Sequence, residues 1–247
     1  MDKNSNKFTF IFSAIMVVVV AVLLSVAAIS LAPFQQKNIR IEKMESILST
    51  VGITAEHTEA EKRFNEHIIE QVVLDVKGQP YSGNVKAFDI DLKKELEKAK
   101  SADATTQLFP LFVGKKQADT FYIIPVRGKG LWGPIWGFVA LTGDMNTIYG
   151  VSFGHDKETP GLGAEINTTA FEEQFAGKKL FDDKGNYVSV NVIKGGAAPS
   201  NPHAVDAVSG ATITSDGVSE MLNRTFTSYL PYFKAKRNQG KQLANSN

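Results

Sequence analysis

The stretch from Phe8 to Ala32 reads FTFIFSAIMVVVVAVLLSVAAISLA and carries no charged side chain. As a helix it is long enough to cross about 30 Å of hydrocarbon, and a helix satisfies its own backbone polar groups in lipid. We therefore expect a single transmembrane helix over residues 8–32, preceded by a short N-terminus over residues 1–7. The alternative is a cleaved signal peptide, but Ser30-Leu31-Ala32 is a poor small-x-small cleavage site.

Basic residues flank this apolar stretch on both sides. Lys3 and Lys7 precede it, and Lys37, Arg40 and Lys43 follow it. Long domains cross membranes largely regardless of such counts. Charge alone therefore leaves the orientation of the chain open.

The composition narrows the chemistry of the rest of the chain. Its 247 residues include 27 Lys+Arg and 26 Asp+Glu, and this near balance argues against a nucleic-acid partner. With 43% hydrophobic residues the chain has enough apolar side chains to fold. It contains no cysteine, which excludes thiolate metal sites, cysteine nucleophiles and disulfides. The four histidines lack zinc-ligand spacing, so we expect no functional metal site.

Residues 33–107 are expected to form a juxtamembrane helix and a structural elaboration. Apolar residues recur at helical spacing from Ile41 to Val51 and stop at Gly52, which is typical of a glycine C-cap. Beyond it the patterns predict a helix over Glu56–Glu70, a strand over Val72–Val76 and a charged helix over Asp91–Lys100.

Residues 108–233 have a different sequence pattern, in which β-branched and aromatic runs are separated by glycine- and aspartate-rich turns. The expected class is α+β, an antiparallel sheet with flanking helices, followed by a polar tail over residues 234–247. The predicted strands are Phe121–Val126, Phe138–Thr142, Ile148–Phe153 and Tyr187–Ile193, and the predicted helices are Asn167–Phe175, capped by Asn167 or Thr168, and Asp216–Tyr229.

Three glycine-rich stretches are candidates for a binding site. They read GKGLWGP at residues 128–134, HDKETPGLGAE at 155–165 and DAVSGATIT at 206–214. Any one of them could be only a turn. The third leads into an amphipathic helix, and a helix N-terminus binds phosphate. The simpler alternative makes Thr214 or Ser215 the N-cap of that helix.

The segment Asp206-x-x-Ser209-Gly210-Ala211-Thr212 resembles the flavinylation motif of FMN-binding domains in bacterial membrane redox complexes. In that motif the last threonine carries FMN through a phosphoester. With Gly130–Gly133, Glu158–Gly163 and the N-terminal span, the whole chain resembles the single-span, FMN-carrying subunit of Na+-translocating NADH:quinone reductases. The second candidate family is the related subunit of Rnf-type electron-transport complexes, which shares the anchor and the motif.

The resemblance to the NADH:quinone reductase family implies a role for each matching residue. Thr212 is the expected attachment point of one covalent FMN per chain, and a flavin transferase reads Asp206, Ser209, Gly210 and Ala211. Trp132 and Leu162 are expected to flank the flavin ring, with core packing as the alternative for Trp132. The remaining candidates are Glu158, Thr159, Gly161 and Gly163, which shape the surrounding loop, and Lys194, which either approaches the flavin or faces solvent.

The resemblance also implies an electron-relay protein in a complex of six subunits in the bacterial inner membrane, with the flavin domain in the periplasm. NADH oxidation, quinone reduction and sodium export then involve partner subunits, and this chain has no NADH:quinone turnover alone. No dinucleotide fingerprint or Walker loop is present in the sequence. The alternative to a redox function is that the chain is a flavin-free, membrane-tethered assembly module.

Overall fold

The computed structural model describes residues 6–244, with side chains to residue 237. It divides the chain into two compact units, residues 1–43 and 44–247. The first unit consists of most of helix α1 (Asn6–Ser49), which is long and apolar enough to cross a membrane. Its apolar side chains are exposed rather than packed in a protein core, as expected for a helix that contacts lipid.

The predicted juxtamembrane helix is not a separate element. Helix α1 continues through Pro33 to Ser49. The proline has no N–H and so removes one helical hydrogen bond, but the helix does not end there. The predicted C-cap at Gly52 is confirmed: its φ is +67°, and the Ile53 N–H donates to the Leu48 carbonyl at 3.1 Å.

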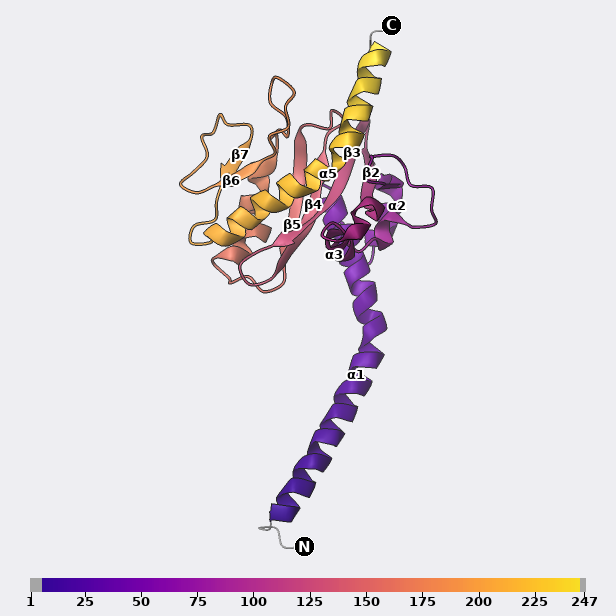
Figure 1. The fold of residues 1–247 in the computed structure, drawn as a ribbon, viewed down its shortest axis with the longest axis vertical. Coiled ribbons are helices and arrows are strands. Elements are labelled where there is room, and N and C mark those ends of the chain that lie inside the picture. The colour runs from indigo at the N-terminus through magenta and orange to yellow at the C-terminus, as the bar shows by residue number, and fades with distance from the viewer. Residues whose placement is uncertain (1–5, 245–247) are drawn as a thin grey trace. The chain divides into compact units, whose positions relative to one another are not determined.

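The second unit is built on one antiparallel sheet in the order β1-β2-β3-β4-β5 (Figure 1). Consecutive strands pair as neighbours; the connections from β2 to β5 are short, whereas the one from β1 to β2 spans residues 75–108. The strands are β1 (Ile68–Leu74), β2 (Phe109–Lys116), β3 (Asp119–Lys129), β4 (Pro134–Leu141) and β5 (Ile148–His155).

Helices cover both faces of this sheet. Helix α5 (Thr212–Ala244) lies across one face, where Met221 and Phe226 pack with Ile124 and Val139 (Figure 1). The other face contacts helix α2 (Ala60–His67), where the Phe64 ring packs against the Phe112 ring of β2. There an added Cβ on Gly150 would lie 2.5 Å from the Thr50 carbonyl oxygen. The expected α+β class is therefore confirmed.

The sheet is not confined to the residues after Leu108, since β1 pairs with β2 along its length. The predicted helix over Glu56–Glu70 shortens to α2 because Ile68 and Ile69 join the sheet. The predicted strand over Val72–Val76 ends at Leu74, where the Asp75 side chain accepts hydrogen bonds from two backbone N–H groups of a turn. The charged helix is present as α3 (Leu92–Lys98), between the short 3-10 helices η1 (Ala87–Asp89) and η2 (Ala102–Thr106).

The segment between β5 and α5 is more broken than the sequence predicts. The helix predicted over Asn167–Phe175 consists of α4 (Thr169–Glu172) and the 3-10 helix η4 (Glu173–Phe175), and it follows η3 (Gly163–Asn167). The strand predicted over Tyr187–Ile193 is wrong in its first half, because Ser189 has a φ of +62°. Only β6 (Asn191–Ile193) remains, and it pairs in parallel with β7 (Ala204–Asp206).

The last helix is longer than predicted at both ends. It begins at Thr212 rather than Asp216 and runs to Ala244, through most of the expected polar tail. Pro231 lies inside it. Residues 1–5 of the expected N-terminus and 245–247 of the expected tail lie outside the described residues.

Candidate functional site

The three glycine-rich stretches meet at one cavity of about 360 Å³. Its walls come from the turn between β3 and β4, the loop after β5, and the start of α5. The lining residues are Leu131, Trp132, Glu158, Thr159, Leu162, Gly163, Gly210, Ala211, Thr212, Ile213 and Thr214.

Glu158 connects the walls of this cavity. Glu158 is only 5% exposed, and its Oε1 accepts a hydrogen bond from the backbone N–H of Trp132 at 2.8 Å. Its Oε2 accepts a hydrogen bond from the Thr214 hydroxyl at 2.6 Å. Both carboxylate oxygens therefore have partners, as a buried carboxylate requires.

Two glycines leave the space that this carboxylate occupies. An added Cβ on Gly130 would lie 2.5 Å from Glu158 Oε1. An added Cβ on Gly163 would lie 2.7 Å from Thr214 Oγ1 and still closer to Glu158 Oε2. Contacts this short exclude a side chain at Gly130 unless Glu158 moves, and at Gly163 unless Glu158 and Thr214 both move.

The start of α5 presents Thr212 to the cavity. Gly210, with a φ of +75°, turns the chain into the helix, and an added Cβ there would meet Leu162 Cδ2 at 2.7 Å. The first helical hydrogen bond runs from the Ser215 N–H to the Ala211 carbonyl at 2.9 Å. Thr214 and Ser215 thus lie inside the helix and are not its N-cap, which corrects the simpler alternative from the sequence.

The two threonines in this first turn differ in their environments. Thr214 is 1% exposed, and its hydroxyl donates to Glu158. Thr212 is partly exposed at the cavity. Of the two, only Thr212 therefore combines a solvent-accessible side chain with a place in the first turn of the helix.

Large apolar side chains surround the cavity but are not packed in the core. Trp132 is 64% exposed, which rules out the core-packing alternative for this residue. Leu131, Leu162 and Ile213 are exposed beside it. The sequence motifs contain Leu131 and Ile213, yet only the structure adds them to the candidate residues.

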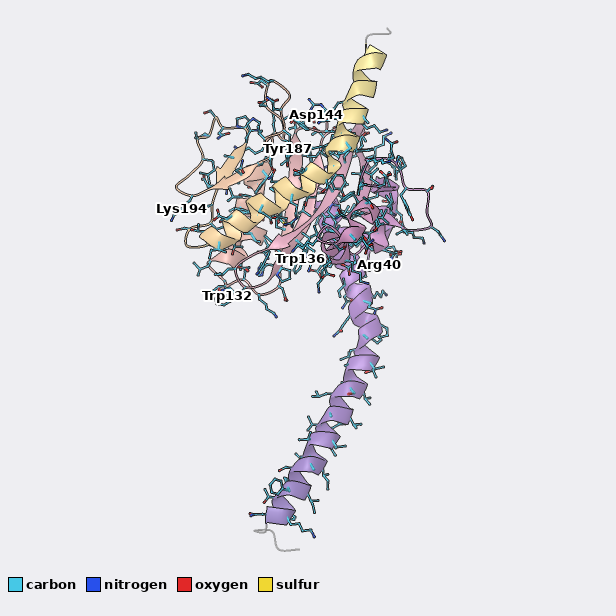
Figure 2. All side chains as sticks on the ribbon, viewed as in Figure 1. Arg40, Trp132, Trp136, Asp144, Tyr187 and Lys194 are labelled. Carbon is cyan, nitrogen blue, oxygen red and sulfur yellow. The ribbon has the colours of Figure 1, made fainter. Side chains whose placement is uncertain are left out.

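Four candidate residues are not among those lining the cavity: Asp206, Ser209, Gly161 and Lys194. Asp206 instead accepts a hydrogen bond from the Ala197 N–H at 2.6 Å. Lys194 is exposed in the connection after β6, and it lies apart from Trp132 in the view of Figure 2. Ser209 is exposed next to Gly210, and Gly161 has a φ of +74° in the loop after β5.

Part of the chain matches a known family, and this match defines the class of protein. Residues 130–227 match the FMN-binding domain family, and this range contains the β3–β4 turn, the loop after β5 and the start of α5. The chain is therefore an FMN-binding protein. It belongs, more specifically, to the NqrC family of the Na(+)-translocating NADH-quinone reductase, as its relatives show.

The member of this family from Neisseria meningitidis serogroup A is 35% identical, and the match covers 98% of each chain. The one from Vibrio vulnificus is 32% identical over 83% of this chain and 84% of the relative. The crystal structure of the Parabacteroides distasonis member has a TM-score of 0.73 and 38% identity, and it covers 82% of this chain and 96% of that one. NqrC from Shewanella oneidensis has a TM-score of 0.65 and 28% identity, covering 82% and 98%.

The residues at the cavity fit FMN. Apolar side chains at its mouth suit a planar ring, and Gly210 lets one of them, Leu162, approach the start of α5. The expectations of FMN as cofactor and of the NADH:quinone reductase family are confirmed. The apolar span of α1 makes this a membrane-anchored protein.

Proposed function

We propose that this chain relays electrons within a Na+-translocating NADH-quinone reductase through one FMN joined to Thr212 by a phosphoester. The observation that carries the proposal is the contrast between two hydroxyls in one helical turn. The Thr212 side chain lines the cavity and is partly exposed, whereas the Thr214 hydroxyl is buried and donates to Glu158. A flavin transferase can reach only the first.

The start of α5 suits the charge of a phosphodiester. The first N–H groups of a helix have no intrahelical acceptor and carry partial positive charge. Thr212 is the first residue of α5 and therefore holds its side chain beside these groups. A phosphate attached there is stabilised without a nearby lysine, so Lys194 is not needed for this role.

The apolar side chains at the cavity mouth orient the ring. Trp132 and Leu162 come from different walls and offer an aromatic and an aliphatic surface to the faces of a planar group. FMN supplies the electron-transfer chemistry when bound. The chain's residues hold it, orient it and limit its contact with water.

The partners follow from membership of the complex. The reductase has six subunits, and the others oxidise NADH, reduce quinone and export sodium, so this chain alone has no such turnover. The flavin domain lies in the periplasm, behind a single span in the bacterial inner membrane. Asp206, Ser209, Gly210 and Ala211 are the residues that the flavin transferase recognises around Thr212.

The test is flavin fluorescence in a denaturing gel, with the chain produced beside an active flavin transferase. We expect a fluorescent band for the wild-type protein and for Thr214→Ala, and none for Thr212→Ala. Fluorescence that survives in Thr212→Ala would overturn the attachment site. A dark wild-type band would overturn covalent attachment itself.

A further inference from the structure

A second hollow of about 380 Å³ lies between α3, the C-terminal end of β3 and α5. It shares no lining residue with the FMN cavity. Charged side chains dominate its walls. They are Lys93, Glu97, Lys100, Arg127, Lys129 and Arg224. We call this hollow the basic cleft.

The basic cleft concentrates positive charge in a chain whose formal net charge is only +1. Five cationic side chains line it against one carboxylate, that of Glu97. Arg224 forms an ion pair with Glu220, but within the described part of the chain the other four cations form no ion pair. Like charges gathered this closely repel one another, so an anionic ligand stabilises them.

Arg224 has an unused donor at this place. Its Nη2 donates to the Arg127 carbonyl at 2.6 Å. Its Nε is buried and has no hydrogen-bond partner among the described residues. A buried donor without an acceptor is costly, but this atom is covered, so Arg224 contributes its positive charge to the basic cleft rather than a free Nε donor.

A smaller apolar recess of about 80 Å³ adjoins the basic cleft, and Leu96, Ala99, Arg127 and Arg224 line both. Leu92, Phe109 and Pro125 supply further apolar surface in the recess. The recess can therefore take a small aliphatic group but not a large side chain.

The wall that β3 contributes is a partly open sheet edge, since its Arg127 carbonyl already accepts a hydrogen bond from Arg224 Nη2. Pairing between β2 and β3 ends at Phe112 and Ile123, whereas β3 continues to Lys129 with β4 on its other side. Among the described residues no strand pairs with this second edge of the last part of β3. The edge therefore offers only its remaining backbone groups to an extended polypeptide, beside side-chain pockets of the kind that such sites use.

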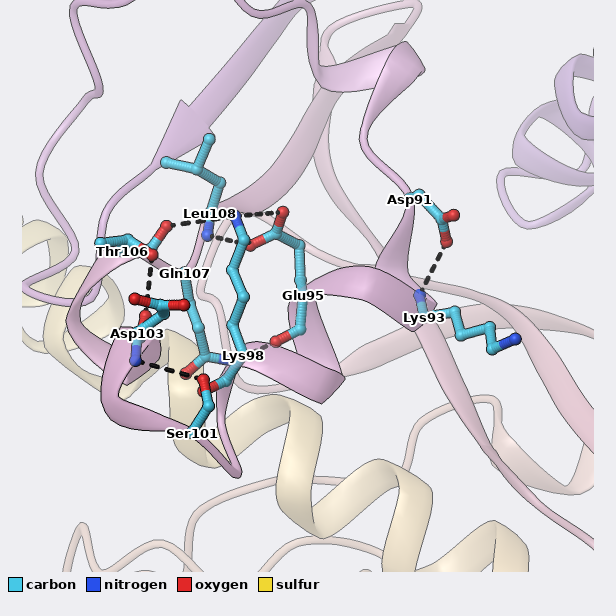
Figure 3. A network of polar contacts seen from close by, with 9 residues as sticks. All are labelled: Asp91, Lys93, Glu95, Lys98, Ser101, Asp103, Thr106, Gln107 and Leu108. Atoms are coloured by element: carbon cyan, nitrogen blue, oxygen red, sulfur yellow. Dashed lines mark hydrogen bonds and ion pairs between the residues drawn. The ribbon is translucent and has the colours of Figure 1, made fainter.

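The wall that α3 contributes is held in place by Glu95 (Figure 3). The Glu95 carboxylate accepts hydrogen bonds from Lys98 Nζ at 2.9 Å and from the Leu108 N–H at 2.8 Å. The Gln107 side chain donates to the Glu95 carbonyl at 2.8 Å. These contacts tie α3 to the start of β2, so the basic cleft is a preformed feature.

We infer that the basic cleft binds an extended acidic segment of a partner protein in the complex, with an aliphatic side chain in the recess and carboxylates on the surrounding cations. The inference rests on the proposed function within an assembly of several subunits. A small inorganic anion uses only the charged part of the cleft and leaves the recess and the β3 edge without a role. Lys129 directly precedes the turn that carries Trp132, so the segment docks next to the FMN cavity.

The test is co-purification of the other subunits with the tagged full-length chain, in detergent and over a range of salt concentrations. We expect Lys93→Glu/Lys100→Glu to reduce the recovered partner subunits by about fivefold or more near physiological salt, since reversed charges repel acidic side chains. Ala99→Leu fills the recess without changing the charge and should reduce the recovery as well. The matched control is Lys94→Glu/Lys184→Glu, which reverses two exposed lysines outside the basic cleft.

Equal recovery for the cleft and control variants at every salt concentration, with Ala99→Leu also unaffected, would overturn the inference. The intact mass of each purified chain separates this result from a failure of the proposed function. A chain that carries FMN and retains its partners despite the cleft variants contradicts only the cleft. A wild-type chain that retains no other subunit contradicts the proposed complex itself.

Discussion

The Glu158 carboxylate accepts a hydrogen bond from the Thr214 hydroxyl at 2.6 Å, although the two residues are 56 positions apart in the sequence. This contact connects the loop after β5 to the first turn of α5. The second Glu158 oxygen reaches the β3–β4 turn through the Trp132 N–H. One buried carboxylate thus sets the spacing of all three walls of the FMN cavity.

Removal of this carboxylate should loosen the cavity. Glu158→Ala leaves the Trp132 N–H and the Thr214 hydroxyl without their acceptor and should lower the free energy of unfolding by about 3 kcal/mol. Glu158→Gln keeps one amide oxygen as an acceptor and should cost about 1 kcal/mol. Thermal unfolding of the full-length chain in detergent measures both. Equal unfolding temperatures for Glu158→Ala and the wild-type protein would contradict this role.

Two glycines in the loop after β5 should respond differently to alanine. In Gly163→Ala the new Cβ collides with Glu158 and Thr214, which are hydrogen-bonded to each other, so we expect a loss of about 2–3 kcal/mol and poorer FMN incorporation. In Gly161→Ala the Cβ points into open space, and only the φ of +74° costs energy, about 1 kcal/mol. Chemical unfolding compares them, and a larger loss for Gly161→Ala would contradict the geometry.

Glu172 should make stability depend on pH. Burial raises its pKa from 4.5 to about 7, although the Phe153 N–H partly opposes this shift by donating to the carboxylate. Between these two values the unfolded chain releases the proton that the folded chain keeps, so stability falls as the pH rises from about 4.5 to about 7. Glu172→Gln removes this contribution and should raise the unfolding temperature at pH 8 relative to wild type but not at pH 4.5. The Glu173→Gln variant is the control, and an identical pH dependence of Glu172→Gln and wild type would refute the shift.

Local sequence patterns predict part of this fold well. The end of α1 near Gly52 and the strands β3 and β5 follow from a glycine C-cap and from β-branched runs. Strand β7 and the start of β1 are missed because their residues are stabilised by partners far away in the sequence, which a local pattern does not contain. The early start of α5 is also missed, because Thr214 and Ser215 look like caps until their hydrogen-bond partners are known.

The candidate site is likewise predicted in part by local sequence and in part determined by distant contacts. The glycine-rich stretches can be identified from sequence, yet only the fold brings them to one cavity and explains Gly163 through Glu158. Asp206 belongs to the motif but does not line the cavity. Its side chain instead accepts a hydrogen bond from the Ala197 N–H, which the motif alone does not predict. Sequence supplies the residue types, and the pairing of distant segments supplies their surroundings.

The proposed orientation can be tested with single cysteines, because the chain has none of its own. A membrane-impermeant thiol reagent that reaches the periplasm should label Lys37→Cys in intact cells. It should label Ser5→Cys only after the cells are broken open. The reverse pattern would place the flavin domain in the cytoplasm.

The most direct measurement of the central claim is the intact mass of the chain produced with an active flavin transferase, for wild type, Thr212→Ala and Thr214→Ala. The account predicts an added mass of one FMN minus water in the wild-type protein and in Thr214→Ala, and an unmodified mass in Thr212→Ala. An unmodified wild-type chain, or a modified Thr212→Ala chain, would contradict it.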